Sequence, residues 1–182
     1  MRGSPWFVTD RHDHTAGVDK AAFSPCRNYR YLLTRRWGHG PTLCWIMLNP
    51  STASAFDDDA TIRRCRTFSQ RAGYAGLTVI NLYSLRSTDP KALWTRTEAE
   101  RIGPLGDQFI AEQAGTRTDA IAAWGAHGAR NERGQRVADT LAQVGVTLHC
   151  LGVTGNGQPR HPLYVPGGTP FQPYQVREVS HA

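Results

Sequence analysis

The 182-residue sequence lacks a long apolar run. A helix that spans a bilayer needs about 20 consecutive apolar residues, and no segment of this chain approaches that, so we expect no membrane association. No apolar segment follows the charged start Met1-Arg2-Gly3-Ser4, which argues against a secretory signal peptide. We therefore expect a cytoplasmic protein, and a monomer.

Lysine is nearly absent. Lys20 and Lys91 are the two lysines, so arginine supplies almost all of the positive charge behind the formal net charge of +6. Arginine suits bidentate contacts to phosphate, and a basic chain fits a nucleic-acid or nucleotide partner. A high-GC coding bias that replaces lysine by arginine explains the same composition, and the sequence leaves both explanations open.

Cysteine is sparse and widely spaced. The residues are Cys26, Cys44, Cys65 and Cys150, and no pair has the close spacing typical of zinc or iron–sulfur sites. We therefore predict no metal and no cofactor. Cys44 and Cys150 fall in apolar segments, where we expect buried thiols.

The chain length fits one domain with a substantial core. Hydrophobic residues make up 40% of the chain and charged residues 20%, which is ordinary for a globular protein. Residues 1–28 are polar and mixed, and we interpret them as an N-terminal arm. Residues 29–182 are predicted to form a single α/β domain.

Short apolar runs bounded by proline, glycine or asparagine predict buried strands. The clearest, Thr42–Leu48, lies between Pro41 and Asn49-Pro50. The segment 29–33 is predicted as an edge strand. Further strands are expected at 77–82, 120–124 and 146–151.

Helices are predicted between these strands, at 60–72, 98–115 and 131–144. In the first, Ile62, Cys65 and Phe68 recur on one face. Alternating strands and helices favour right-handed βαβ units and a parallel sheet. In such sheets ligands bind beyond the carboxyl ends of the strands, so the candidate site residues are those that follow the strands.

Asn49, Pro50 and Ser51 follow the first buried strand. The carboxamide of Asn49 offers both donors and an acceptor, enough to hold a water molecule or a carbonyl group. Its alternative role is to cap the loop in an Asx-turn. We predict that Asn49 is catalytic and that Pro50 and Ser51 bind substrate.

Asp57-Asp58-Asp59 precedes the first predicted helix. These carboxylates are candidates for a general base or a magnesium site. Capping of the helix and its dipole explains them equally, and one residue can serve both purposes. Asp58 is the predicted catalytic member.

Asn81 ends the second buried strand, and its amide can read the edge of a planar base. A strand-terminating turn is the alternative. Arg86, in the following loop, is a candidate phosphate ligand or a solvated arginine. Tyr83 and Phe56 are candidates to stack on a base.

Two later segments complete the predicted site. Trp124, Gly125 and His127 follow the third strand. The glycine permits close backbone approach, and packing in the core is the alternative role of the tryptophan. His161 lies between Arg160 and Pro162 in a Gly-rich segment. Its imidazole is predicted to stabilise a departing anion.

Long motifs resemble a bacterial family known as domain of unknown function 1643, from about Tyr31 to Tyr164. The resemblance is carried by segments that surround the candidate residues. They are Asn49-Pro50-Ser51-Thr52-Ala53, Asp58-Asp59-Ala60-Thr61-Ile62-Arg63-Arg64-Cys65, Gly73-Tyr74, Asn81-Leu82-Tyr83, Arg86-Ser87-Thr88-Asp89-Pro90, Ala123-Trp124-Gly125 and His161-Pro162-Leu163-Tyr164.

The order of these motifs is also similar, more distantly, to the uracil-DNA glycosylase superfamily. That resemblance implies a three-layer αβα fold with a short, mostly parallel four-stranded central sheet. It implies that Asn49 positions the attacking water, that Asn81 reads the base and that His161 stabilises the leaving base. Ser51 and Leu163 stand where those motifs carry glycine and serine.

We therefore expect an N-glycosidic bond hydrolase that acts on a nucleobase in DNA or in a nucleotide. Two alternatives stay open at this point. One is a non-catalytic module that binds nucleic acid or nucleotides, and the other is a biosynthetic enzyme for a small nucleoside or nucleotide.

Overall fold

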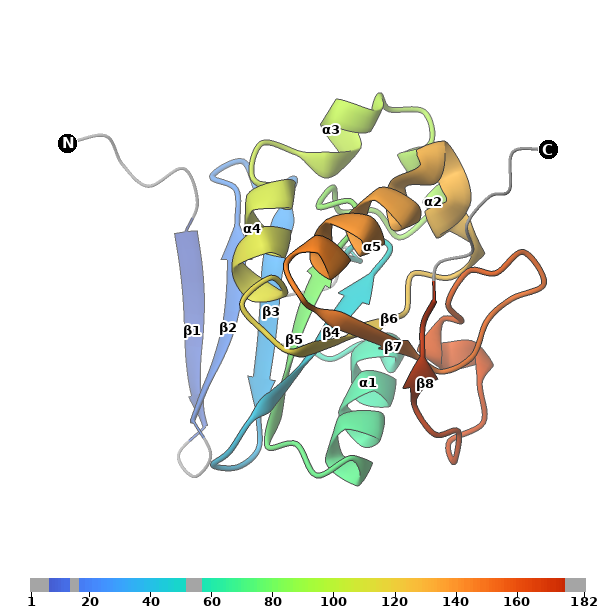
Figure 1. Ribbon diagram of the computed structural model, residues 1–182. Helices are drawn as coiled ribbons and strands as arrows, with labels where there is room; N and C mark the ends of the chain where they lie inside the picture. Colours follow the sequence, from blue (N-terminus) through green and yellow to red (C-terminus); the bar gives the residue numbers. More distant parts are fainter. Residues whose placement is uncertain (1–6, 14–16, 52–56, 176–182) are drawn as a thin grey trace.

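The computed structural model describes residues 7–13, 17–51 and 57–175. Their strands form one eight-stranded sheet in the order β1-β2-β3-β5-β4-β6-β7-β8 (Figure 1). The strands are β1 (Phe7–Asp13), β2 (Gly17–Phe23), β3 (Arg30–Arg36), β4 (Thr42–Met47), β5 (Gly76–Asn81), β6 (Asp119–Ala122), β7 (Thr147–Cys150) and β8 (Gln172–Pro173).

The sheet is mixed rather than mostly parallel. Strands β5, β4, β6 and β7 pair in parallel, while β1, β2 and β3 at one side and β8 at the other pair antiparallel. The predicted four-stranded, mostly parallel sheet is therefore wrong for the sheet as a whole. The segment predicted as an edge strand is also internal, because β2 and β5 flank β3.

Residues 1–28, predicted as an arm, include two strands of this sheet. β1 pairs with β2 from Phe7↔Phe23 to Asp13↔Gly17, and β2 continues the sheet through Ala21↔Leu33. The sequence of β1, Phe-Val-Thr-Asp-Arg-His-Asp, is mostly polar. Backbone pairing at the side of a sheet needs no apolar alternation, which explains why the pattern hid these strands.

β4 is buried on both faces, as a continuous apolar run requires. Cys44 and Ile46 pack into one core, and Leu43, Trp45 and Met47 into the other. The indole of Trp45 donates to Ser69 Oγ over 3.0 Å, so its polar atom is satisfied inside the core.

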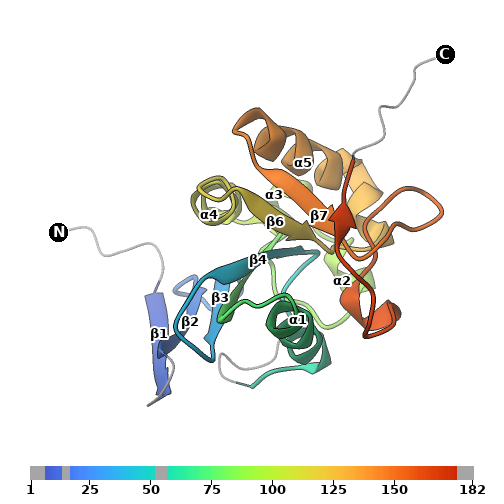
Figure 2. The ribbon, with the colours of Figure 1, turned by 60° about the horizontal axis from the view of Figure 1, so that its bottom comes forward.

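Helices cover both faces of the parallel strands (Figure 2). On one face α1 packs through Ile62, Cys65 and Phe68, and on the other α4 and α5 pack through residues such as Ile110 and Leu141. The helices are α1 (Ala60–Arg71), α2 (Pro90–Leu93), α3 (Glu98–Ile102), α4 (Gly106–Gln113) and α5 (Arg133–Gln143), with 3-10 helices η1 (Ala126–Glu132) and η2 (Pro162–Tyr164). The fold is therefore mixed α/β.

The single helix predicted over 98–115 is two helices, α3 and α4. Gly103 ends α3 with φ +75°, and Pro104 follows it, which disfavours helical backbone before it and removes a backbone donor. A Cβ on Gly103 would lie 2.5 Å from the ring of Tyr29, so this turn requires glycine. The predicted start of the helix over 131–144 shifts to Arg133, because Asn131 and Glu132 have positive φ.

None of the helices in the described ranges combines the length and the apolar character that a membrane crossing demands.

Candidate functional site

A cleft of about 660 Å³ opens beyond the carboxyl ends of β4, β5 and β6. A volume of this size is typical of small-molecule sites. Its lining comes from the loop after β4, the first turn of α1, the end of β5 and the loops around 124–127 and 154–164. The polar and aromatic residues among them are Arg30, Asn49, Ser51, Asp59, Thr61, Asn81, Ser87, Thr88, Trp124, His127, Thr154, Arg160, His161 and Tyr164.

Asn49 lies half-buried in the cleft, where β4 has just ended. Its Nδ2 donates to the carbonyl of Ser87 over 2.9 Å and to that of Pro50 over 3.2 Å. The side-chain donors are thus satisfied by backbone, and the amide oxygen accepts no hydrogen bond from the described residues. Asn49 therefore has the fixed orientation and the vacant acceptor that holding a water molecule requires.

The carboxylate of the cleft is Asp59. As the N-cap of α1, its Oδ1 accepts from the amide of Ile62 over 2.8 Å, which satisfies one of the helix's unpaired donors. Its Oδ2 accepts from the hydroxyl of Ser51 over 3.0 Å. Asp59 thus serves as a helix cap and also borders the cleft.

Asp58, the predicted catalytic carboxylate, does not line the cleft. Its Oδ1 accepts from Arg35 Nε over 2.7 Å, and Arg35 is only 3% exposed. Asp19 lies 3.8 Å from the same nitrogen. The position of Asp58 is explained by neutralising a buried arginine. The sequence pattern did not show which of Asp58 and Asp59 caps the helix. The structure assigns the cap to Asp59, because α1 begins at Ala60.

Arg30 was not among the predicted site residues. It begins β3, is 4% exposed and lines the cleft. Its Nε has no hydrogen-bond partner among the described residues. Burial lowers the pKa of the guanidinium to about 10, with Asp59 opposing the shift. The sequence signal was an arginine at the head of the apolar run Tyr31-Leu32-Leu33.

Asn81 occupies the predicted position at the end of β5. It is 4% exposed and lines the cleft, and it pairs in register with Met47 at the end of β4. Its Nδ2 finds no hydrogen-bond partner within the described ranges. A buried amide without a partner costs stability, so this group is a candidate for contact with a ligand.

His161 lines the cleft and is the N-cap residue of η2. Its Nδ1 accepts from the amide of Leu163 over 3.3 Å, which assigns the ring proton to Nε2. Burial lowers the pKa of the imidazole, and the Asp59 carboxylate opposes this shift. The ring is therefore neutral at pH 7 and retains one donor.

The loop that carries His161 is fixed to the rest of the molecule. Gly125 donates its amide to the carbonyl of Pro159 over 2.9 Å, and Arg64 donates to the carbonyls of Pro162 and Val165. Gly125 has φ +72°, and a Cβ there would lie 3.6 Å from that of His161. The backbone of Gly125 thus passes close to the histidine, as its prediction as a site residue requires.

Trp124 is a core residue that also borders the cleft. It is 1% exposed and packs edge-on against Tyr174, so it belongs to the core. Its Nε1 donates to Gln158 over 2.9 Å, and the ring also borders the cleft. His127 lies exposed on η1 at the cleft, with its ring centroid 5.9 Å from that of Trp94.

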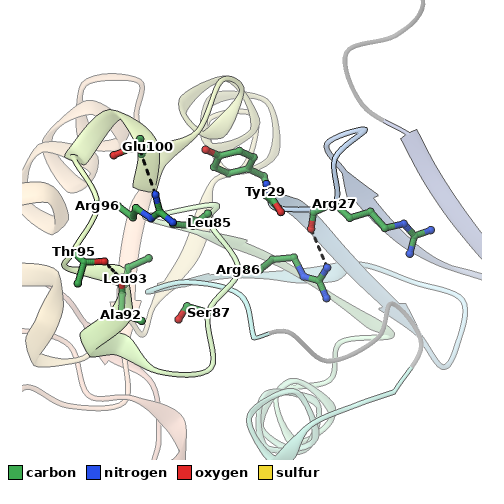
Figure 3. Close-up of a pocket in the computed structure, with 11 residues that line it drawn as sticks. Arg27, Tyr29, Leu85, Arg86, Ser87, Ala92, Leu93, Thr95, Arg96 and Glu100 are labelled. Atoms are coloured by element: carbon green, nitrogen blue, oxygen red, sulfur yellow. Dashed lines mark hydrogen bonds and ion pairs between the residues drawn. The ribbon is translucent and has the colours of Figure 1, made fainter.

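Three predicted binding residues are not at the cleft surface. Tyr83 is fully buried, packs edge-on against Trp94 and directs its hydroxyl toward the carbonyl of Arg130. Pro50 is buried and contributes its carbonyl to the loop. Arg86 lies in a second pocket of about 600 Å³ (Figure 3). Phe56 lies outside the described residues.

The cysteines form no cluster. Cys44, Cys65 and Cys150 are buried and Cys26 is exposed, all as free thiols. Burial raises the pKa of the Cys44 thiol to about 12, which makes it unreactive. No group of three or more metal-ligating side chains is found in the described part of the chain.

Comparison with known proteins gives a family but no activity. No curated protein and no solved structure matches the chain. A family described as protein of unknown function (DUF1643) matches residues 30–163. This range runs from β3 into η2 and includes every residue that lines the cleft except Tyr164. The chain therefore belongs to the DUF1643 family of proteins of unknown function.

Proposed function

We propose that this protein hydrolyses the N-glycosidic bond of a nucleotide, free or in DNA, held in the cleft between Asn49, Asp59 and His161. The observation that carries this proposal is the convergence of an oriented amide, a carboxylate and a neutral imidazole on one cleft from separate chain segments. Those groups match the needs of the reaction, which are a positioned water, a stabilised cationic sugar and a stabilised leaving base.

Asn49 holds the attacking water. Because its Nδ2 is fixed by the carbonyls of Ser87 and Pro50, its oxygen is the remaining polar atom and accepts a hydrogen bond from the water. The water oxygen then forms its bond to the sugar carbon C1′ as the C1′–N bond breaks.

Asp59 faces the developing positive charge on the sugar. Its carboxylate stabilises an oxocarbenium-like transition state and takes one proton from the attacking water. The hydrogen bonds from Ile62 and Ser51 hold the carboxylate in place before substrate arrives. This assigns to Asp59 the role that the sequence pattern gave to Asp58.

His161 receives the leaving base. The electron pair of the broken bond stays on the base nitrogen, and the Nε2–H of the neutral ring donates a hydrogen bond to that anion. The base is protonated on release by the proton that Asp59 took from water. One water is consumed, and a free base and a sugar hydroxyl are formed.

Base release is the direct test. The protein is incubated with the common deoxynucleosides, their 5′-monophosphates, and single- and double-stranded oligonucleotides, and free base is measured by chromatography. We expect release from at least one class, with Asn49→Ala and Asp59→Asn strongly impaired and Asp58→Asn active. No release from any substrate, together with an Asn49→Ala variant indistinguishable from the wild type, overturns the proposal.

Nucleic-acid binding without catalysis is the second candidate, and the second pocket favours it. Arg27, Arg86 and Arg96 line this pocket beside a single carboxylate, Glu100 (Figure 3). Ser87 lines both this pocket and the cleft, so the two are adjacent. Salt-dependent binding of an oligonucleotide without base release would support this function.

A further inference from the structure

The cleft contains two buried hydrogen-bond donors that have no acceptor among the described residues. Arg30 and Asn81 are each 4% exposed and both line the cleft. Arg30 Nε and Asn81 Nδ2 lack partners among the described residues. Because buried donors are almost always paired in folded proteins, these groups indicate a ligand that presents acceptors.

The carboxylate that acts on Arg30, Asp59, accepts hydrogen bonds from other groups. Its two carboxylate oxygens accept from Ile62 and Ser51. It raises the pKa of Arg30 by Coulombic attraction, yet the ion pairs of the described residues include none between these two side chains. The guanidinium is therefore attracted by Asp59 and keeps its donors for another group.

Part of the cleft wall is apolar. Met47, Leu48, Ile62 and Val79 line the cleft together with Trp124. Apolar walls with a few converging polar groups suit a flat heteroaromatic ring. The ligand atoms near Arg30 and Asn81 thus belong to a ring edge that carries hydrogen-bond acceptors.

A neutral ring edge fits this wall better than a phosphate does. A phosphate close to Arg30 would also lie close to the Asp59 carboxylate, and like charges in a desolvated cleft repel strongly. A purine with a 6-oxo group presents two adjacent acceptors, O6 and N7, without net charge. The planar fork of an arginine matches that pair geometrically.

We propose that Arg30 and Asn81 select a 6-oxopurine base, guanine or hypoxanthine, by donating to its oxo and ring-nitrogen acceptors. This inference rests on the proposed function in one respect, that a nucleobase enters the cleft. It makes Arg30, which was not among the predicted site residues, a specificity-determining residue.

Binding of nucleosides tests the selection without requiring hydrolysis. Calorimetry at pH 7 compares deoxyguanosine, deoxyinosine, deoxyadenosine and deoxyuridine, which carry no phosphate. An Asn49→Ala variant is included to suppress turnover. We expect the two 6-oxopurine nucleosides to bind about tenfold tighter or more than the other two, in line with the discrimination of a bidentate base contact.

Three substitutions assign the selection to the named donors. Arg30→Lys keeps the charge and loses the fork, Arg30→Met loses both, and Asn81→Asp replaces donors by acceptors at constant shape. Each is expected to abolish most of the preference for 6-oxopurines. Arg71→Gln is the control, because Arg71 is exposed at the end of α1 and lines neither pocket.

The outcomes separate this inference from the proposed function. Selective binding without base release supports selection of 6-oxopurines and contradicts the proposed hydrolase activity. Base release without preference among bases supports the hydrolase activity and contradicts the selection. Equal affinity for the four nucleosides, or no binding of any, overturns the selection. The selection is also overturned if inorganic phosphate competes with the nucleosides and the Arg30→Lys variant binds them with unchanged affinity. That result would identify an anion site instead.

Discussion

The hydroxyl of Ser51 donates to the Asp59 carboxylate over 3.0 Å. Ser51 belongs to the loop after β4, and Asp59 caps α1 through the amide of Ile62. One carboxylate therefore connects the strand end to the helix that follows it, and it does so at the edge of the cleft. Asp59 therefore has a structural role in addition to the catalytic role that we propose, and substitutions can test the two roles separately.

Replacement of Asp59 by asparagine should remove activity and keep the fold. Asparagine caps helices about as well as aspartate, so we expect the free energy of unfolding to change by less than about 1 kcal/mol. The loss of charge and of a proton acceptor should lower base release by about 10²- to 10⁴-fold. Urea unfolding and chromatography of the released base measure the two effects. A fully active Asp59→Asn protein would contradict the assignment.

Replacement of Asp58 by asparagine should have the opposite effect. The substitution keeps an acceptor oxygen but removes the negative charge 2.7 Å from the buried Arg35 guanidinium, although Asp19 remains nearby. We expect the free energy of unfolding to fall by about 1–3 kcal/mol, with base release per folded molecule unchanged. If Asp58→Asn loses activity at full stability, Asp58 and not Asp59 is the functional carboxylate.

The sequence predicted the strand ends well because buried parallel strands carry a continuous apolar run. Asn49, Asn81, Trp124, Gly125, His127 and His161 all line one cleft, as residues following neighbouring strands should. The sequence did not predict β1 because an edge strand tolerates polar residues, and it did not predict β2 because Asp19 and Lys20 interrupt its apolar pattern.

The side-chain positions that the sequence did not predict depend on tertiary contacts. Asp58 and Asp59 are adjacent in sequence, and their tertiary partners distinguish them: Asp58 pairs with Arg35, whereas Asp59 accepts from Ser51 at the cleft. Tyr83 follows Asn81 closely but packs inward against Trp94. Arg30 precedes an apolar strand, where an arginine is usually solvated, and its burial follows from the surrounding fold.

The protonation of His161 should weaken the native state at acidic pH. Burial lowers the pKa of this imidazole below its ordinary value of about 6.5. Between the two pKa values the unfolded chain binds more protons, so stability is full above about pH 6.5 and is lost as the pH falls through the folded-state pKa. Protonation of Nδ1 also removes the acceptor for Leu163.

This dependence is isolated by comparison with His161→Gln, in which the other histidines still titrate. We expect the difference in the free energy of unfolding between the wild type and His161→Gln to shift against the wild type from pH 7.5 to pH 5. Urea unfolding at several pH values measures it. A difference that is constant with pH would mean that His161 titrates as it does in the unfolded chain.

The buried charge of Arg30 should lower the free energy of unfolding of the protein. Its pKa is lowered to about 10 by burial, so at pH 7 the group is charged and the full desolvation penalty applies. Replacing it by methionine keeps most of the side-chain volume and removes the buried charge. We expect Arg30→Met to raise the free energy of unfolding by about 1–3 kcal/mol.

Arg35→Met is the matched control for that experiment. Arg35 lies on the same strand and is buried to the same degree, but Asp58 neutralises it, so its loss should destabilise the protein. Urea unfolding of both variants at pH 7 gives the comparison. Opposite signs would show that the Arg30 guanidinium is unpaired in the folded protein and is held for a ligand. A destabilisation of Arg30→Met as large as that of Arg35→Met would mean that Arg30 serves the fold instead.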